Sequence, residues 1–318
     1  MKNNAVKRFL RENYIIAVVV IALVVMTCVK SHYLTAHNIS NIFSQVAIFG
    51  IVSAAMTISI IGGEFDLSVG SMMGMISLFF ARMVQTNSVF GTILFCIFLG
   101  IVCGAFNGVL VGIVKISSFV ATLSTMMVFK GIALTYCNSS PISFHEDVLF
   151  NFASGSWLGI PIPAWFFFLF LILAGLLLRH TRFGRDVYAT GGSYEVAKLA
   201  GVNVVGVKIM LFVILGFCTA VASILLACKM NSGNALYGDS LTMTAVTGVV
   251  IGGSSLSGGK GDAFKTFWGM VFMGILFNAL LRLQVDGNWQ NVITGAILIA
   301  VITIDALMRL KRAKRVRS

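Results

Sequence analysis

Charged residues are scarce in this chain. Only 11% of its 318 residues are Asp, Glu, Lys or Arg, whereas 58% are hydrophobic. A soluble globular domain is typically about 25% charged, so this composition excludes an ordinary soluble protein. Apolar runs approaching or exceeding ~17 residues, about the length of a membrane-crossing helix, recur along the whole chain. A β-barrel is disfavoured because these runs are continuous rather than alternating. The sequence predicts an all-α, polytopic integral membrane protein with one transmembrane domain over residues 1–318.

Residues that usually build disulfide frameworks, metal sites and hydrolytic centres are few and scattered. The cysteines show no paired spacing and mostly fall in apolar runs, which indicates small buried hydrophobic residues: Cys28, Cys96, Cys103, Cys137, Cys218 and Cys228. The histidines have neither metal-ligand spacing nor the arrangement of a triad: His32, His37, His145 and His180. We therefore expect no catalytic residue, no metal site and no enzymatic activity.

A nucleotide-binding loop is also missing. The phosphate-binding pattern G-x-x-x-x-G-K-[ST] is approached in "GGSSLSGGKG", but Ser254 replaces the first glycine and Gly261 replaces the final Ser or Thr. No soluble strand precedes this stretch. The sequence therefore predicts that the chain itself binds neither ATP nor another cofactor.

The apolar segments predict about ten membrane crossings, which place both termini on the same side. The segments are Tyr14–Val29, Ile39–Ile61, Leu67–Val84, Phe90–Val114, Phe119–Cys137, Ile162–Leu178, Val207–Cys228, Leu241–Ile251, Phe264–Leu281 and Trp289–Leu307. The weakest is Leu241–Ile251, which needs flanking Ser, Thr and Gly residues to cross a bilayer. We interpret the first segment as a retained helix rather than a cleaved signal peptide, because "VKSHYLTAH" offers no small-x-small cleavage site.

The basic residues predict the orientation. If the N-terminus is inside, 18 of the 23 Lys and Arg residues lie on the cytoplasmic side, and the outer ends keep Lys30, Arg82, Lys130, Lys229 and Arg282. This asymmetry matches the positive-inside rule, so we expect both termini in the cytoplasm. The basic tail at 308–318 is then expected to bind anionic membrane lipid. Nucleic acid is not an expected partner, because the tail has no interleaved aromatic residues.

The expected outer loop at 138–161 is rich in proline. It holds Pro141 and Pro161, and Pro163, the third and last proline of the chain, follows directly. The loop is long enough for a short interfacial helix and a docking surface on the outer face. A plain connector is the open alternative.

A long polar segment at 179–206 interrupts the apolar pattern on the cytoplasmic side. Ser193 is a candidate helix N-cap, Glu195 places negative charge in the first turn, and Gly201 is a candidate C-terminal stop. Three residues between them share one helical face: Val196, Leu199 and Ala200.

This short helix is expected to need a packing partner. About two turns of helix are unstable alone in water, so the apolar face should rest on a partner protein or on the membrane surface. The preceding Gly191–Gly192 pair allows a sharp turn that would present the helix away from the bilayer.

The same segment resembles a known family. "GRDVYATGGSYEVAKLAGV" at 184–202 is similar to the cytoplasmic loop of permease subunits of ribose-type ABC sugar importers, G-R-x-x-Y-A-x-G-G-N-x-x-A-A-x-L-(A/S)-G-I. "GGEFDLSVGS" at 62–71 resembles the family's G-G-x-D-L-S-V-G-S, and further signatures lie at 117–134 and 252–262. The ordered matches cover nearly the whole chain. Ser193 departs from the usual Asn.

The resemblance implies a function and partners. In that family this loop is the coupling helix, which sits in a groove of a separate ATPase subunit that binds ATP. Carried onto this chain, the coupling residues are Gly184, Arg185, Tyr188, Gly191, Gly192, Ser193, Glu195, Ala197, Leu199 and Gly201. The resemblance further implies a bacterial cytoplasmic membrane, an extracytoplasmic sugar-binding protein and a second permease chain, identical or paralogous. The cargo would be a monosaccharide or a related polyol, and which sugar stays open.

Polar residues near the second and third segments are candidates for a translocation path. Glu64 and Asp66 follow a glycine pair, and Gly63 permits a helix break where carboxylates could line a water-filled route together with Ser68. The alternative, favoured for Asp66, is that it caps the next helix.

Asn107 and Asn278 lie inside apolar segments and could line the pore, although a hydrogen bond across a helix interface is favoured for both. The stretches "IGGEFDLSVG" and "IGGSSLSGG" share a short internal sequence similarity.

Two other function classes stay open. One is a self-sufficient secondary transporter, driven by protons or cations through Glu64 or Asp66. The other is a membrane scaffold or receptor that carries no solute. The polar cytoplasmic helix favours the ATP-driven importer over both.

Overall fold

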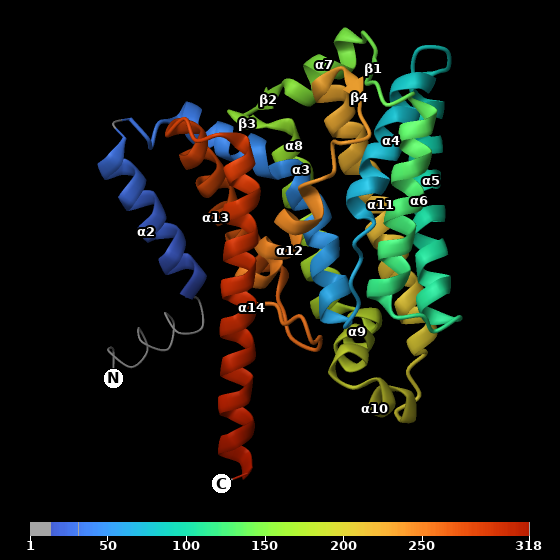
Figure 1. Ribbon diagram of the computed structural model, residues 1–318, viewed down its shortest axis with the longest axis vertical. Coiled ribbons are helices and arrows are strands. Elements are labelled where there is room, and N and C mark those ends of the chain that lie inside the picture. The colour runs from blue at the N-terminus through green and yellow to red at the C-terminus, as the bar shows by residue number, and fades with distance from the viewer. Residues whose placement is uncertain (1–13, 31, 318) are drawn as a thin grey trace.

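A bundle of helices makes up most of the molecule (Figure 1). The computed structural model describes residues 14–30 and 32–317, with side chains up to 303. The helices are α2 (Tyr14–Val29), α3 (Ala36–Ile61), α4 (Val69–Met83), α5 (Val89–Gly112), α6 (Ser118–Tyr136), α7 (Asp147–Ser154), α8 (Ile162–His180), α9 (Arg182–Gly192), α10 (Tyr194–Leu199), α11 (Val204–Met230), α12 (Leu241–Ile251), α13 (Ala263–Arg282) and α14 (Gly287–Arg317). Each expected apolar segment overlaps one of these helices. The side chains of the basic tail at 308–318 lie outside the described residues.

The helices confirm a helical membrane protein. In the part of the chain that the structure describes, six helices are long and apolar enough to cross a bilayer: α3, α5, α6, α8, α11 and α13. Three shorter apolar helices accompany them: α2, α4 and α12. The number of crossings, ten, stays a prediction, as does the side on which the termini lie.

The two ends of the bundle carry different short elements (Figure 1). At one end lie α7 and the small strand pairs, in which β1 (Ile142–Ser143) pairs antiparallel with β4 (Ser232–Gly233) and β2 (Ser156–Trp157) pairs with β3 (Ile160–Pro161). The short helix expected in the 138–161 loop is therefore confirmed as α7. At the opposite end lie α9 and α10, on the side to which the C-terminal end of α14 also points.

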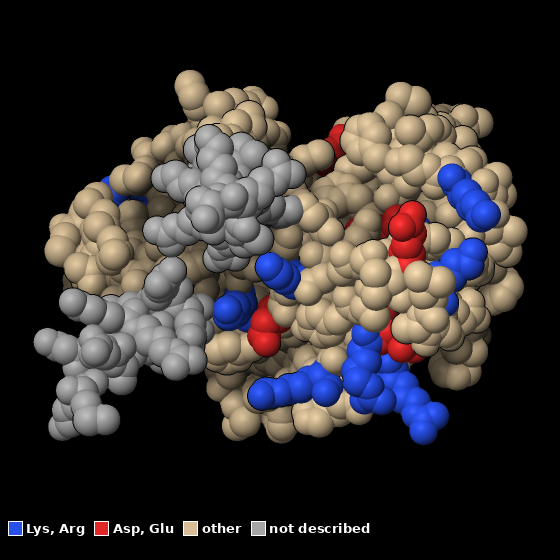
Figure 2. Space-filling model, turned by 90° about the horizontal axis from the view of Figure 1, so that it is seen from below, with Lys and Arg blue, Asp and Glu red and all other residues tan. Residues whose placement is uncertain are grey.

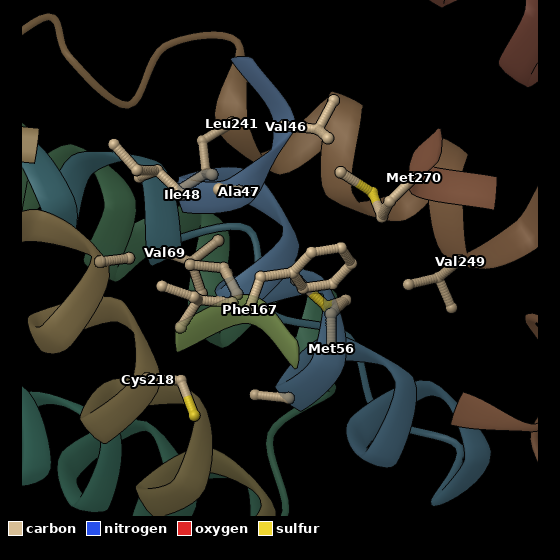
Figure 3. Close-up of a cluster of buried hydrophobic side chains, with 14 of the residues drawn as sticks. Val46, Ala47, Ile48, Met56, Val69, Phe167, Cys218, Leu241, Val249 and Met270 are labelled. Atoms are coloured by element: carbon tan, nitrogen blue, oxygen red, sulfur yellow. The ribbon is translucent and has the colours of Figure 1, made fainter. Parts of the chain in front are cut away.

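The core gathers around α3, whose C-terminal half is buried. Figure 3 shows Phe167 of α8 among side chains of α3, α4, α11, α12 and α13, including Met56, Val69, Cys218 and Met270. All six cysteines are free, and every one except Cys28 is buried, which confirms their role as small hydrophobic residues.

The helices α4 and α12 are short because each is one part of an interrupted membrane segment. The chain leaves α3 at Ile61, runs without helix through residues 62–68 and enters α4 in the protein interior. A non-helical stretch at 231–240 likewise leads into α12, apart from the two residues of β4. The first turn of α4 meets the stretch that precedes α12, since a β-carbon at Gly70 would overlap the carbonyl oxygen of Gly238. Irregular backbone at membrane depth is stable only where protein or water satisfies its polar groups.

Glycines at four-residue spacing hold α5 against α11. Gly100, Gly104 and Gly108 form a stripe on α5, and a β-carbon at Gly104 would overlap the carbonyl oxygen of Phe212 in α11. Because helices in a membrane gain little from the hydrophobic effect, small residues that allow close backbone approach are what bring them together.

This packing predicts opposite effects for two glycine-to-alanine changes. Gly104→Ala should lower the free energy of unfolding in detergent by about 1–3 kcal/mol, because the added methyl forces α5 and α11 apart. Gly175→Ala in α8 is the matched control, since its β-carbon would meet only Ala263 Cβ at 3.8 Å. The control should be neutral or stabilising by up to about 1 kcal/mol. Equal thermal midpoints for the two variants would contradict the close α5–α11 contact.

Candidate functional site: the polar helix pair and the interrupted helices

Two capped helices form the polar segment. Thr181 accepts a hydrogen bond from the Gly184 N–H (3.0 Å) and caps α9. Ser193 accepts from the Val196 N–H (3.4 Å) and caps α10, as the sequence predicts. Gly201 stops the chain beyond α10 with a φ of +82°, which confirms its predicted role and favours glycine there.

The sequence interpretation missed α9 and placed the turn wrongly. Gly191 and Gly192 are the last two residues of α9 rather than a turn, and the chain changes direction at Ser193, which is extended with a φ of −163°. Phe183 and Val187, four residues apart on the buried face, are the signal that could have revealed this helix. The glycine pair obscured it because glycine is a poor helix former.

Close backbone contact explains Gly191. A β-carbon at this position would overlap the carbonyl oxygen of Ile61, the last residue of α3, and would approach the backbone nitrogen of Gly259 to 2.7 Å. The Gly259 N–H donates to the same Ile61 oxygen (2.7 Å). The end of α9 is therefore held between the end of α3 and the 252–262 loop.

The two internally similar stretches, which begin at Ile61 and Ile251, adopt the same local conformation. Gly63 follows α3 with a φ of +81° and donates its N–H to Ile60. Gly253 follows α12 with a φ of +95° and donates its N–H to Val250, the equivalent residue. Both glycine motifs therefore end a helix in the same way.

Tyr188 joins α9 to the same loop. Its hydroxyl donates to the Gly261 carbonyl oxygen (2.8 Å). Burial, with a smaller contribution from the Asp262 carboxylate, raises the pKa of Tyr188, so the hydroxyl stays protonated and able to donate.

An exposed apolar surface remains on α10. Leu199 is 89% exposed and Val196 is 65% exposed, whereas Ala197 faces inward. Figure 2 shows acidic and basic side chains on this end of the molecule. An exposed apolar pair among polar neighbours is typical of an interaction site.

The ten predicted coupling residues divide into two groups. Gly184 and Ala197 are buried, and the partly buried Gly191 and Tyr188 contact the end of α3 and the 252–262 loop, so these four position the helix pair. The others are exposed: Arg185, Gly192, Ser193, Glu195, Leu199 and Gly201. The coupling role itself stays a prediction.

A chain of electrostatic contacts connects α10 to the break after α3. The Glu64 carboxylate pairs with Lys208 Nζ of α11 (2.5 Å), and the Glu64 side chain is only 7% exposed. The same ammonium group lies 5.5 Å from the ring centre of Tyr194 in α10. These three residues and Lys115 line a cavity of about 440 Å³. The break at Gly63 is confirmed, and Glu64 is charge-paired.

The other polar residues predicted for a path lie inside hydrogen-bond networks. The Asp66 carboxylate accepts from the Ser68 N–H (2.7 Å) and hydroxyl (2.6 Å), and Asn107 Nδ2 donates to Ser68 Oγ (2.8 Å). All three are fully buried. This network fixes the start of α4 against α5. Asp66 and Asn107 thus have structural roles, as the sequence favours, rather than exposed positions along a path.

Asn278 lies in a second, separate network. Its side-chain amide exchanges hydrogen bonds with that of Asn38 in α3 (3.1 Å each way), and Arg282 donates to Asn38 Oδ1 (2.8 Å). These bonds tie α13 to α3. Asn278 therefore bonds across a helix interface, the role favoured by the sequence, rather than lining a pore. In the described residues, no group of three or more His, Cys, Asp or Glu could hold a metal ion.

The interrupted helices, the buried polar networks and the exposed helix α10 are typical of a membrane transport permease. The chain matches the family described as "Branched-chain amino acid transport system / permease component" over residues 38–302, and it belongs to this family.

Curated relatives match over almost their full length. The chain is 30% identical to the ribose import permease protein RbsC of Haemophilus influenzae over 315 residues, 98% of each chain. It is 36% identical to RbsC of Bacillus subtilis over 291 residues, 90% of this chain and 89% of that one. It is 32% identical to the L-arabinose transport system permease protein AraH of Escherichia coli over 307 residues, 93% and 91% of the two chains. No solved structure matches the chain.

Adjacent glycines in α9 supply a test of its anchoring. Gly191→Ala should loosen α9 from α3 and raise the rate of trypsin cleavage at Arg185 in the purified chain several-fold, because exposed backbone opens more often. Gly192→Ala is the control, since its β-carbon would meet nothing within 4 Å. If both variants were cut at the wild-type rate, the contact of Gly191 with Ile61 would not anchor the helix.

Proposed function

We propose that this chain is the permease subunit of an ATP-driven ABC importer for a monosaccharide or a related polyol. The observation that carries the proposal is the nearly full-length similarity to ribose and L-arabinose permeases. The cargo would be a ribose-like or hexose-like sugar. The chain supplies the translocation path and performs no chemistry, and ATP is bound by a separate ATPase subunit.

The helix pair α9–α10 is the proposed docking site of the ATPase. Val196 and Leu199 are exposed, and packing them in a groove of a partner would remove two apolar side chains from water. Their shared face, the polar surroundings and the family-like loop all support this role. The lipid surface is the alternative resting place for the same face.

Two contacts would transmit movement of α9–α10 to the membrane. Gly191 abuts the end of α3, and Tyr194 reaches Glu64 through Lys208. Both contacts end at the break between α3 and α4. Pressure from the ATPase would therefore bias the interrupted helix between two packings that open the path to opposite sides.

The wider assembly follows from the same proposal. The chain would form one domain over 1–318 in the bacterial cytoplasmic membrane, with ten crossings and both termini inside. A second permease chain would complete the path. An extracytoplasmic sugar-binding protein would dock on the 138–161 loop, opposite the coupling loop at 179–206, and the 308–318 tail would bind membrane lipid. The common end of α9, α10 and the end of α14 supports this topology.

An ion-coupled secondary transporter fits the site less well. Glu64 is already paired with Lys208, and Asp66 is enclosed by Ser68 and Asn107. Neither carboxylate is free to bind and release an ion. One curated relative, YphD of Escherichia coli, is named a probable ABC transporter permease protein, which favours the ATP-driven class.

Charge on the exposed face of α10 tests the docking site. Leu199→Asp should abolish copurification of an ATPase subunit in mild detergent and abolish sugar uptake, because a carboxylate cannot enter an apolar groove unpaired. Leu34→Asp is the control, since Leu34 is also exposed (53%) but lies in the turn between α2 and α3, outside both proposed docking surfaces. Retention of the ATPase by the Leu199 variant would remove α10 as its docking site.

Exchange of the Glu64–Lys208 charges tests the transmission route. Glu64→Gln should lower the sugar transported per ATP hydrolysed roughly tenfold, the effect of about 1.4 kcal/mol of lost coupling. The double variant E64K/K208E restores an ion pair and should recover much of that ratio. In an ion-coupled transporter, by contrast, Glu64→Gln would stop uptake without regard to ATP, and the exchange would not rescue it.

A further inference from the structure

An ion pair that the functional proposal has not used lies between α6 and the stretch before α12. Lys130 Nζ pairs with the Asp239 carboxylate, and the side chains remain 26% and 56% exposed. Lys130 is inside α6, one of the helices of membrane-crossing length. Asp239 follows Gly238 directly.

Packing places Asp239, the acidic member of the pair, beside the first turn of α4. The Gly238 carbonyl contacts Gly70, the second residue of α4. At 1.5 Å per residue, Gly70 lies roughly 20 Å along α4 from the other end of that helix, whereas the hydrocarbon core of a bilayer is about 30 Å thick. Asp239 is therefore at the level of the membrane interior, next to the point where the interrupted helices meet.

The exposed part of an ion pair at this depth cannot face the hydrocarbon core of the lipid bilayer. Charged side chains within membrane spans face a bundle interior, a water-filled cavity or another protein, because hydrocarbon solvates them poorly. The polar residues predicted for the path behave differently, since Asp66, Ser68 and Asn107 are fully buried in this chain. At the crossing of the interrupted helices, Lys130 and Asp239 thus present polar groups that a solute could reach.

We propose that Lys130 and Asp239 line the sugar translocation path and contact the sugar. This inference rests on the proposed importer function. A sugar hydroxyl both donates and accepts, so a carboxylate and an ammonium group side by side can satisfy both of its roles. The pair has no net charge, and a neutral sugar passes without a counter-ion. The surface that Asp239 leaves exposed faces the water-filled route between this chain and its partner chain.

Thiol accessibility in the assembled transporter tests the location. Ser240→Cys keeps the ion pair intact beside the new thiol, and Cys28→Ser removes the exposed native cysteine. In proteoliposomes, a charged, membrane-impermeant methanethiosulfonate should modify the Ser240→Cys variant at least tenfold faster than an Ile132→Cys variant, because thiolates form in water and not in lipid. Ile132 is the control, being 43% exposed and two positions from Lys130, on the opposite side of α6.

The same labelling decides between a path and a protein interface. Slowing of the Ser240→Cys reaction by D-ribose or L-arabinose, delivered with the binding protein, would support sugar contact. An unreactive thiol at 240 in both nucleotide-free and ATP-bound states would overturn the proposal and assign the pair to a dry contact with the second chain. Because labelling is scored without uptake, that result would leave the importer function standing.

Substitution of the pair tests its role in selection. Asp239→Asn and Lys130→Gln keep the side-chain size and should each raise the KM for uptake about tenfold, through the loss of a charge-assisted hydrogen bond. The preference between D-ribose and L-arabinose should change as well, which a purely structural pair would not cause. If both variants keep the wild-type KM and the wild-type preference between the two sugars, the proposed sugar contact is overturned. Failure of the importer function gives a different result, because the wild type itself would then show no ATP-driven uptake of either sugar and no KM could be measured.

Discussion

Direct backbone contact at glycine is the constraint on which the rest of this structure depends. Interrupted helices leave carbonyl and N–H groups unpaired at membrane depth, where water cannot satisfy them. Here the free carbonyl of Ile61 at the end of α3 accepts the Gly259 N–H, and Gly191 lets α9 lie against the same atom. At the other crossing, Gly70 and Gly238 touch through their backbones. Any side chain at these positions would separate the elements and expose the polar groups that the contacts cover.

These contacts join the helices α9 and α10 to the interrupted helices in one mechanical unit. The α9 helix rests on the end of α3 and is tied by Tyr188 to the loop after α12, so it touches both glycine motifs at once. Tyr194 adds a second route through Lys208 to Glu64. A partner that moves α9–α10 therefore acts on both interrupted segments together. The polar networks around Asp66 and Asn278 fix the neighbouring helices, which would leave the breaks as the points where the packing changes.

Much of the fold was predictable because its signals are local. The apolar segments, the Ser193 cap, the Gly201 stop and the break at Gly63 depend on residues within a few positions of one another. The helix α9 was not predicted, because its glycine content lowers helix propensity and its stability comes from packing on α3 and α8. The sequence predicts path residues from their polar chemistry near a helix break, yet Asp66 and Asn107 bond to each other through Ser68 inside the chain.

The sequence by itself determined that this is a helical membrane protein with a short, capped polar helix between apolar segments, since hydrophobic length, capping and glycine stops act over short distances. Only the tertiary structure decided which polar groups pair and which stay accessible. Glu64 meets Lys208, and Lys130 meets Asp239, 109 positions away. No local pattern encodes such a pairing, because it arises when separate helices pack and bring the two charges within bonding distance.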